Sequence, residues 1–152
     1  MAEYTYNEVQ LVQPGASALL DDGIPCNRGL VIHRPGSGIL TLRGRVNNPC
    51  SSFARYRVSY DGNIAIPEGG TPAEIQLALA IGGEIVPTSI AAATPTAAAA
   101  YWNVSGFAII DVPAGCCYTV AVENASVSAD PATTPAAAMN LRNLNVEVTR
   151  LA

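Results

Sequence analysis

Short runs of alternating apolar and polar residues, each closed by glycine or proline, recur along most of this chain. In residues 75–81 the large aliphatic side chains alternate with Gln76, Ala78 and Ala80. Successive side chains of a strand point to opposite faces, so this alternation indicates half-buried β-strands, and helical periodicity is essentially absent. The 13 glycines and 11 prolines are spread between the runs as turn signals rather than pooled in one linker. We therefore predict an all-β fold.

The alternation places strands at residues 39–45, 53–61, 75–81, 84–86, 101–112, 116–123 and 144–148. Gly82 and Gly83 predict a hairpin turn. In 101–112 the even positions are predicted to face inward: Trp102, Val104, Ala108, Ile110 and Val112. The alanine-rich residues 91–100 and 125–138 are predicted to be loops, because prolines interrupt them. About eight to ten short strands with regular turns indicate a β-sandwich or jelly roll.

The chain is unusually poor in charge for its size. Its 152 residues suit one domain, yet only 13% of them are charged, against about 25% in an average soluble domain. A small domain with so few charges is expected to cover part of its surface with a partner. The small-residue face of the 75–81 strand suits close packing against another sheet or subunit, so we predict self-association.

The sign of the charge excludes some partners. Twelve acidic residues oppose eight basic ones, all arginine, and a net charge of −4 argues against nucleic acid. No run of about 18 apolar residues is present, so no membrane-spanning helix is expected. Residues 1–8 have neither the basic nor the apolar region of a secretory signal, which predicts synthesis in a cytosol.

No set of residues suggests catalysis or a cofactor. His33 is the single histidine and has no nucleophile beside it in sequence, so we predict a protein that is not an enzyme. The Asp21–Asp22 pair is interpreted as a solvated turn rather than a calcium site. The four cysteines, Cys26, Cys50, Cys116 and Cys117, form no CxxC spacing and are interpreted as structural thiols, with a Cys26–Cys50 disulfide as the open alternative. No metal or other cofactor is expected.

Four arginines form the one charge cluster of note. Arg43, Arg45, Arg55 and Arg57 share the same parity on two consecutive predicted strands, so antiparallel pairing of these strands would place them on one face. We interpret them as a candidate surface for an anionic partner, and simple solvation stays open as the alternative.

The order of the motifs resembles the TNF-like and C1q-like jelly-roll superfamily, especially its bacterial and phage branch. The resemblance covers residues 25–152 and is carried by Gly38-Ile39-Leu40-Thr41-Leu42, Tyr56-Arg57-Val58-Ser59-Tyr60, Leu77-Ala78-Leu79, Gly82-Gly83, Val86-Pro87-Thr88-Ser89, Ile110-Asp111-Val112-Pro113-Ala114-Gly115, Val122-Glu123-Asn124-Ala125-Ser126 and the final run from Leu144 to Leu151. Ser52-Phe53-Ala54 departs from the family's usual glycine turn, and a collagen-like Gly-X-Y stalk is absent. Residues 1–24 form either an N-terminal arm or the first strand.

The resemblance implies a homotrimer around a three-fold axis that aromatic and aliphatic side chains line. Our candidates for the core and the subunit interface are Tyr56, Tyr60, Leu77, Leu79, Trp102, Val146 and Val148.

The chain is similar to small TNF-like proteins encoded by phages and prophages of Gram-positive bacteria. That similarity implies a virion structural protein, made in the host bacterial cytoplasm and placed on the capsid exterior as a homotrimeric decoration or cement protein that binds the major capsid protein. The alternative is a receptor- or glycan-binding head of a phage tail fibre or of a bacterial surface adhesin.

Overall fold

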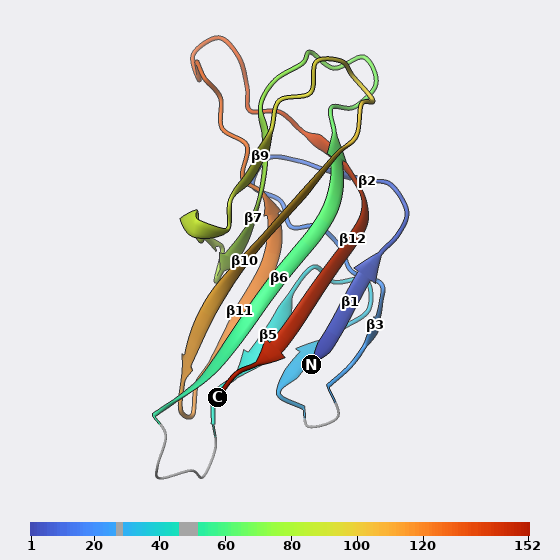
Figure 1. The fold of residues 1–152 in the computed structure, drawn as a ribbon. Coiled ribbons are helices and arrows are strands. Elements are labelled where there is room, and N and C mark those ends of the chain that lie inside the picture. Colours follow the sequence, from blue (N-terminus) through green and yellow to red (C-terminus); the bar gives the residue numbers. More distant parts are fainter. Residues whose placement is uncertain (27–28, 46–51) are drawn as a thin grey trace.

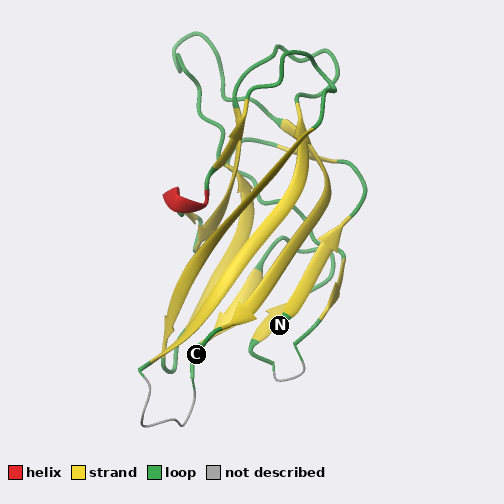
Figure 2. Cartoon of the chain, viewed as in Figure 1, coloured by secondary structure: helices red, strands yellow, loops and turns green. Residues whose placement is uncertain are grey.

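The computed structural model describes residues 1–26, 29–45 and 52–152. Two six-stranded antiparallel sheets pack face to face (Figures 1 and 2). Sheet A contains, in spatial order, β10 (Trp102–Pro113), β6 (Phe53–Ala65), β12 (Met139–Arg150), β1 (Ala2–Tyr6) and β3 (Asp22–Ile24), and β2 (Gln10–Val12) pairs with β12. Sheet B contains β4 (Val31–His33), β5 (Leu40–Arg43), β11 (Cys117–Asn124), β7 (Ile75–Ile81) and β8 (Glu84–Ile85), and β9 (Ala91–Ala93) pairs with β7.

The chain crosses repeatedly between the two sheets. After β5 in sheet B comes β6 in sheet A, and β10, β11 and β12 alternate in the same way. This connectivity and the face-to-face packing confirm the predicted all-β jelly-roll sandwich. The one helical element in the described residues is the 3-10 turn η1 (Pro87–Ser89), and none of their helices is long and apolar enough to span a membrane.

The period-two pattern explains the core. Inward-facing side chains of both sheets, such as Leu42, Tyr56 and Leu79, are completely buried between them. Burial of one large aliphatic side chain stabilises a fold by about 1.5–3 kcal/mol, so the facing rows of such residues hold the sheets together. The small residues Ala78 and Ala80 on the other side of β7 are also buried, within a single chain.

The strand predictions are confirmed in position and partly wrong in length. Residues 75–81 match β7, while β6 and β12 extend several residues beyond their predicted ends. Gly82 and Gly83 both adopt positive φ, 59° and 87°, as a tight hairpin turn requires. Residues 125–138 contain no strand, as predicted, but residues 91–100 include β9, because three alanines pair with β7 at its edge.

The N-terminal residues are built into sheet A. Tyr4 on β1 is the register partner of Val146 on β12 and of Gly23 on β3, and its side chain is buried in the core. Residues 2–6 are therefore a strand of the sandwich.

The buried amide of Asn124 ties three segments together where β11 ends. Its Nδ2 donates to the carbonyls of Val12 (2.9 Å) and Ala137 (3.0 Å), and its Oδ1 accepts from the Ser126 amide (2.9 Å). The side chain thus satisfies backbone groups of β2 and of the loop after β11 that water does not reach.

Asn124→Ala is expected to lower the free energy of unfolding by about 3 kcal/mol, because buried backbone groups lose their partners. Urea unfolding at one fixed protein concentration measures this loss. Asn103→Ala is the matched control: its amide lies on an exposed face beside Asp61, so a change within about 0.5 kcal/mol is expected. Equal unfolding midpoints for the two variants would contradict the assigned role of Asn124.

Candidate functional site

The outward face of sheet A carries two unlike patches. The first, called here the basic-apolar patch, consists of Arg57 on β6 with Phe107 and Ile109 on β10. The side chains of Phe107 and Ile109 are 52% and 49% exposed, and the Arg57 guanidinium carbon lies 4.8 Å from the centre of the Phe107 ring. Ile109 is the register partner of Arg57, so the three side chains form one continuous strip.

The second, called here the acidic patch, consists of Glu147 on β12, Glu3 on β1, and Asp22 and Ile24 on β3. Glu3 and Glu147 are direct register partners, and like charges in that arrangement repel each other. The Asn145 amide donates to a Glu3 carboxylate oxygen at 2.7 Å, but no arginine of the described residues forms an ion pair with either glutamate. Beside them the Ile24 side chain is 68% exposed.

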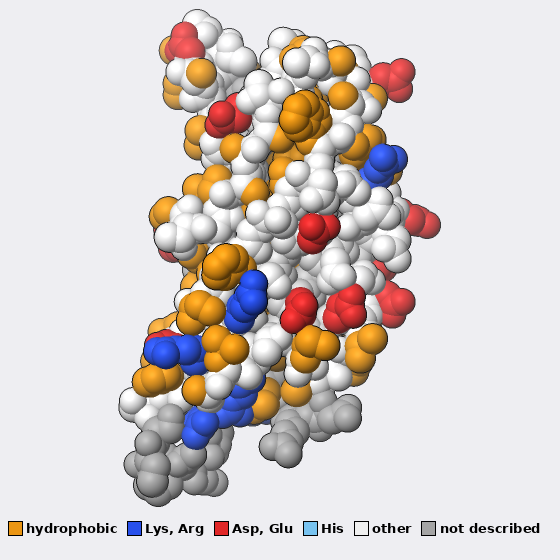
Figure 3. Space-filling view, in the orientation of Figure 1, with side chains coloured by type: hydrophobic (Ala, Val, Ile, Leu, Met, Phe, Trp, Pro, Cys, Tyr) orange, Lys and Arg blue, Asp and Glu red, His pale blue; other side chains and the backbone are white. Residues whose placement is uncertain are grey.

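A shallow hollow of about 540 Å³ separates the two patches. Arg57 and Phe107 line one side of it, and Asn145 and Glu147 line the other. In Figure 3 the carboxylates gather over the middle and right of this face, while arginines and apolar side chains gather at its lower left. Each patch therefore carries charge that the single chain does not neutralise.

Six of the seven predicted core and interface residues lie between the sheets: Tyr56, Tyr60, Leu77, Leu79, Val146 and Val148 are all at most 2% exposed. The Tyr60 hydroxyl lies 2.7 Å from the Leu77 carbonyl and 2.6 Å from the Ser89 carbonyl. Burial raises the pKa of Tyr60, and this hydroxyl stays protonated. These residues build the core of one chain.

Trp102 has the predicted inward parity but is not buried in the core of the single chain, because half of its surface is exposed, and its place in a subunit interface stays a prediction. Trp102 is the first residue of β10, where the strand leaves the loop at one end of the sandwich. Strand parity gives the direction of a side chain, but a residue at the end of a strand is not covered by the opposite sheet.

The predicted arginine face is also wrong in its geometry. Arg43 and Arg45 belong to β5 and the residues after it in sheet B, whereas Arg55 and Arg57 belong to β6 in sheet A. The two consecutive strands lie in different sheets and do not pair, so the four side chains do not share a face.

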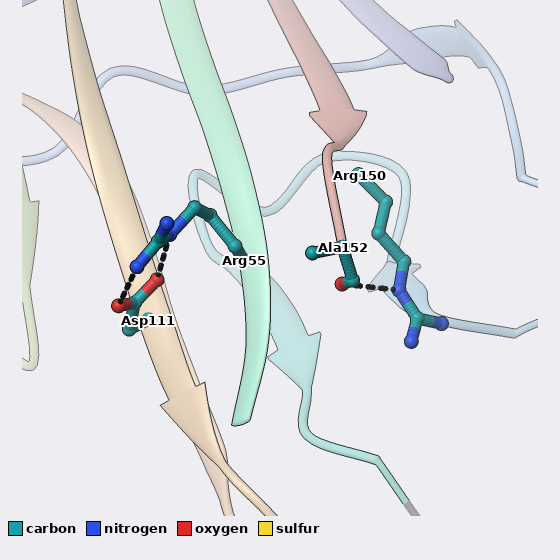
Figure 4. Close-up of polar contacts among 4 residues, drawn as sticks. All are labelled: Arg55, Asp111, Arg150 and Ala152. Atoms are coloured by element: carbon teal, nitrogen blue, oxygen red, sulfur yellow. Dashed lines mark hydrogen bonds and ion pairs between the residues drawn. The ribbon is translucent and has the colours of Figure 1, made fainter. Parts of the chain in front are cut away.

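Arg55 is already neutralised within the chain. Its Nε and Nη2 each lie 2.7 Å from one oxygen of Asp111 on β10 (Figure 4). The hydrogen bonds from Arg55 lower the pKa of the Asp111 carboxyl. Figure 4 also shows Arg150, whose Nε donates to the Ala152 carbonyl at 3.0 Å. Of the four predicted arginines, Arg55 and Arg57 therefore lie on the outward face of sheet A, called here the two-patch face, and Arg55 is the one that forms an ion pair among the described residues.

The described residues contain no group of three or more histidine, cysteine or acidic side chains that could hold a metal ion. His33 contacts the Ser37 carbonyl through Nε2 at 2.9 Å and packs against the Tyr4 ring. Asp22 accepts a hydrogen bond from the Gly23 amide at 2.7 Å. Cys26, Cys116 and Cys117 are free thiols, and the proposed Cys26–Cys50 disulfide involves Cys50, which lies outside the described residues.

Solved structures with a similar fold include the globular domain of zebrafish complement C1qA. It aligns with a TM-score of 0.56 and 14% identity, over 95% of this chain and 92% of that chain. The chain has a C1q-like jelly-roll fold. That finding confirms the fold part of the sequence resemblance, and the identity is low enough that it concerns the fold alone.

Two further solved structures align at lower scores. The C-terminal domain of EclA, a sugar-binding protein, gives a TM-score of 0.37 at 15% identity over 81% of this chain and 86% of that one. The CBM22-1 xylan-binding domain of Paenibacillus barcinonensis Xyn10C gives 0.34 at 12% identity over 99% and 87%. No family model and no curated protein sequence matches the chain.

The two-patch face was not predicted from the sequence, although part of its signal is present there. Phe107 and Ile109 stand at outward parity in the 101–112 strand, where two large apolar residues are unusual on an exposed face. The acidic patch left no comparable signal, because Glu3, Asp22 and Glu147 come together only through the pairing of β12, β1 and β3.

Proposed function

We propose that the protein is a non-catalytic structural head that assembles as a homotrimer through the outward face of sheet A. The observation that carries this proposal is the presence of a basic-apolar patch and an acidic patch on one face. When one copy places its basic-apolar patch on the acidic patch of the next copy, the opposite charges of the two patches neutralise each other. The same contact covers Phe107, Ile109 and Ile24.

In the proposed arrangement each copy turns its basic-apolar patch to one neighbour and its acidic patch to the other, which makes the contact heterologous and lets it close into a ring when the rotation between copies allows it. The resemblance to TNF-like and C1q-like proteins supports a ring of three. Obligate interfaces bury on the order of 2,000 Å² in total, about 1,000 Å² from each copy. Each copy of a ring takes part in two such contacts, so it would bury about one quarter of its 8036 Å² accessible surface.

The purified protein is expected to be a stable trimer at micromolar concentration. Light scattering coupled to size-exclusion chromatography measures its mass directly. A monomer at this concentration would show that the two patches do not join copies of the chain.

We place the trimer on the outside of a bacteriophage capsid, bound to the major capsid protein after synthesis in the bacterial cytoplasm. The support is the sequence resemblance to phage-encoded TNF-like proteins and the match between a trimer and the local three-fold positions of an icosahedral shell. Electron microscopy of virions with and without the gene tests this placement. Trimers only at the tail tip would favour a fibre head, and virions without the protein would exclude both roles.

The second candidate function, a glycan-binding head, is favoured by the exposed Trp102 ring. An accessible indole supplies the flat apolar surface on which sugar rings stack. Binding of the trimer to a glycan array, lost in Trp102→Ala, would support this function over capsid decoration.

A further inference from the structure

Two adjacent cysteines are exposed at the turn between β10 and β11. The turn runs from Pro113 to Cys116, and the Cys116 amide donates to the Pro113 carbonyl at 3.1 Å. Gly115 adopts a φ of 74°, which closes the turn. Cys116 and Cys117 are both exposed free thiols, and neither takes part in the core or in the two-patch face.

The turn is fixed by its neighbours. The Gly44 amide donates to the Cys116 carbonyl at 2.8 Å, and the Gly115 amide donates to the Arg45 carbonyl at 3.0 Å. A Cβ atom on Gly44 would lie 2.0 Å from the Pro113 carbonyl oxygen, so the two segments touch directly. The two thiols therefore stand on a rigid support.

The two thiols are poorly placed to form a disulfide with each other. Consecutive Cα atoms are about 3.8 Å apart, whereas disulfides usually join Cα atoms about 4.4–6.8 Å apart. Each sulfur is therefore available to a partner from outside the chain.

One exposed arginine, Arg43, lies beside Cys117. Cys117 is the register partner of Arg43 on β5, and directly opposite residues place their side chains on the same face of a sheet. Arg43 is exposed, and the Arg45 backbone holds the turn itself. The exposed Arg43 guanidinium attracts anionic molecules toward Cys117.

We propose that Cys116 and Cys117 form a thiol–disulfide exchange site that takes anionic small-molecule disulfides and then couples one copy of the chain to another. The thiolate of one cysteine attacks the small disulfide, whose sulfur–sulfur bond breaks. One small thiolate leaves, and a mixed disulfide remains on the protein. A cysteine of a second copy then attacks the mixed disulfide, the second small thiolate leaves, and an interchain disulfide forms. The small disulfide is the two-electron oxidant for the whole sequence.

The test uses the full chain and two probes of opposite charge, glutathione disulfide and cystamine. Intact-mass spectrometry and peptide mapping are expected to locate the first adduct on Cys116 or Cys117. Glutathione disulfide is expected to react about tenfold faster than cystamine at low salt, and added salt should reduce that ratio. Arg43→Gln is expected to lower the ratio about threefold, while Arg34→Gln, a matched loss of an exposed arginine elsewhere, leaves it unchanged.

At high protein concentration the mixed disulfide is expected to convert to linked chain pairs on a non-reducing gel. The double variant Cys116→Ser/Cys117→Ser should form neither adduct nor linked pair, and Cys26→Ser should form both. A first adduct on another cysteine, equal rates with the two probes, or conversion to an internal Cys116–Cys117 disulfide would each overturn the proposal.

Discussion

Arg57→Glu is expected to yield a folded monomer, and adding Glu3→Arg to the same chain is expected to restore the trimer. In the proposed ring, Arg57 of one copy faces Glu3 and Glu147 of the next. The Arg57→Glu variant places a carboxylate against two others, and a like-charged contact in an interface costs several kcal/mol. A loss of about 3 kcal/mol at each contact weakens it more than 100-fold, enough to dissociate the ring at micromolar concentration.

Restoration in the double variant requires contact between copies. Arg57 lies on β6 and Glu3 on β1, with β12 between them, so within one chain the two strands are about 10 Å apart. Arg43→Glu on sheet B is the matched control and should remain trimeric, and circular dichroism checks that every variant is folded. If both the wild type and the Arg57→Glu variant are trimers, the proposed trimer is supported but its assignment to the outward face of sheet A is wrong.

Leu79→Asp is expected to abolish soluble folded protein. The Leu79 side chain is completely buried on β7, and the residue is fixed by a Ser89 hydroxyl that lies 2.9 Å from its amide. An unpaired carboxylate in an apolar core costs several kcal/mol beyond the lost burial of leucine, which is comparable to the whole stability of a domain, about 5–15 kcal/mol. Val146→Asp, which buries a charge on the facing sheet, should behave in the same way.

Thr119→Asp provides the control for Leu79→Asp. Thr119 lies on the adjacent strand β11 but points outward and is exposed, so the same new charge is solvated there. The soluble yield and the circular dichroism spectrum of the three variants give the comparison. Soluble, folded Leu79→Asp protein would show that the assignment of inward and outward faces on β7 is wrong.

The sequence predicted those features of the fold that depend on local alternation. Leu77, Leu79, Val146 and Val148 are buried as expected, because a period of two decides which side of a strand faces the core. Alternation carries no information on which sheet a strand joins. For that reason Arg43 and Arg57, on consecutive strands, were expected to share a face and instead lie in opposite sheets.

The candidate site depended on long-range pairing and was therefore beyond sequence analysis. Glu3 and Glu147 stand side by side although almost the whole chain separates them in sequence. The exposure of Trp102 could not be predicted either. Its alternation along the strand gave the correct inward direction, but its exposure depends on how far the opposite sheet extends. Neither property is encoded in the residues near the position itself.

β10 is an edge strand of sheet A, and this position exposes newly made chains to aggregation. Among the described strands β10 pairs only with β6, so one long side of this 12-residue strand offers unpaired backbone groups beside Phe107 and Ile109. Such a border is a template for strand addition and aggregation. Pro113 and the charged Asp111 interrupt the template at one end only. Assembly with other copies therefore competes with aggregation. Chains that assemble slowly are expected to aggregate into insoluble material.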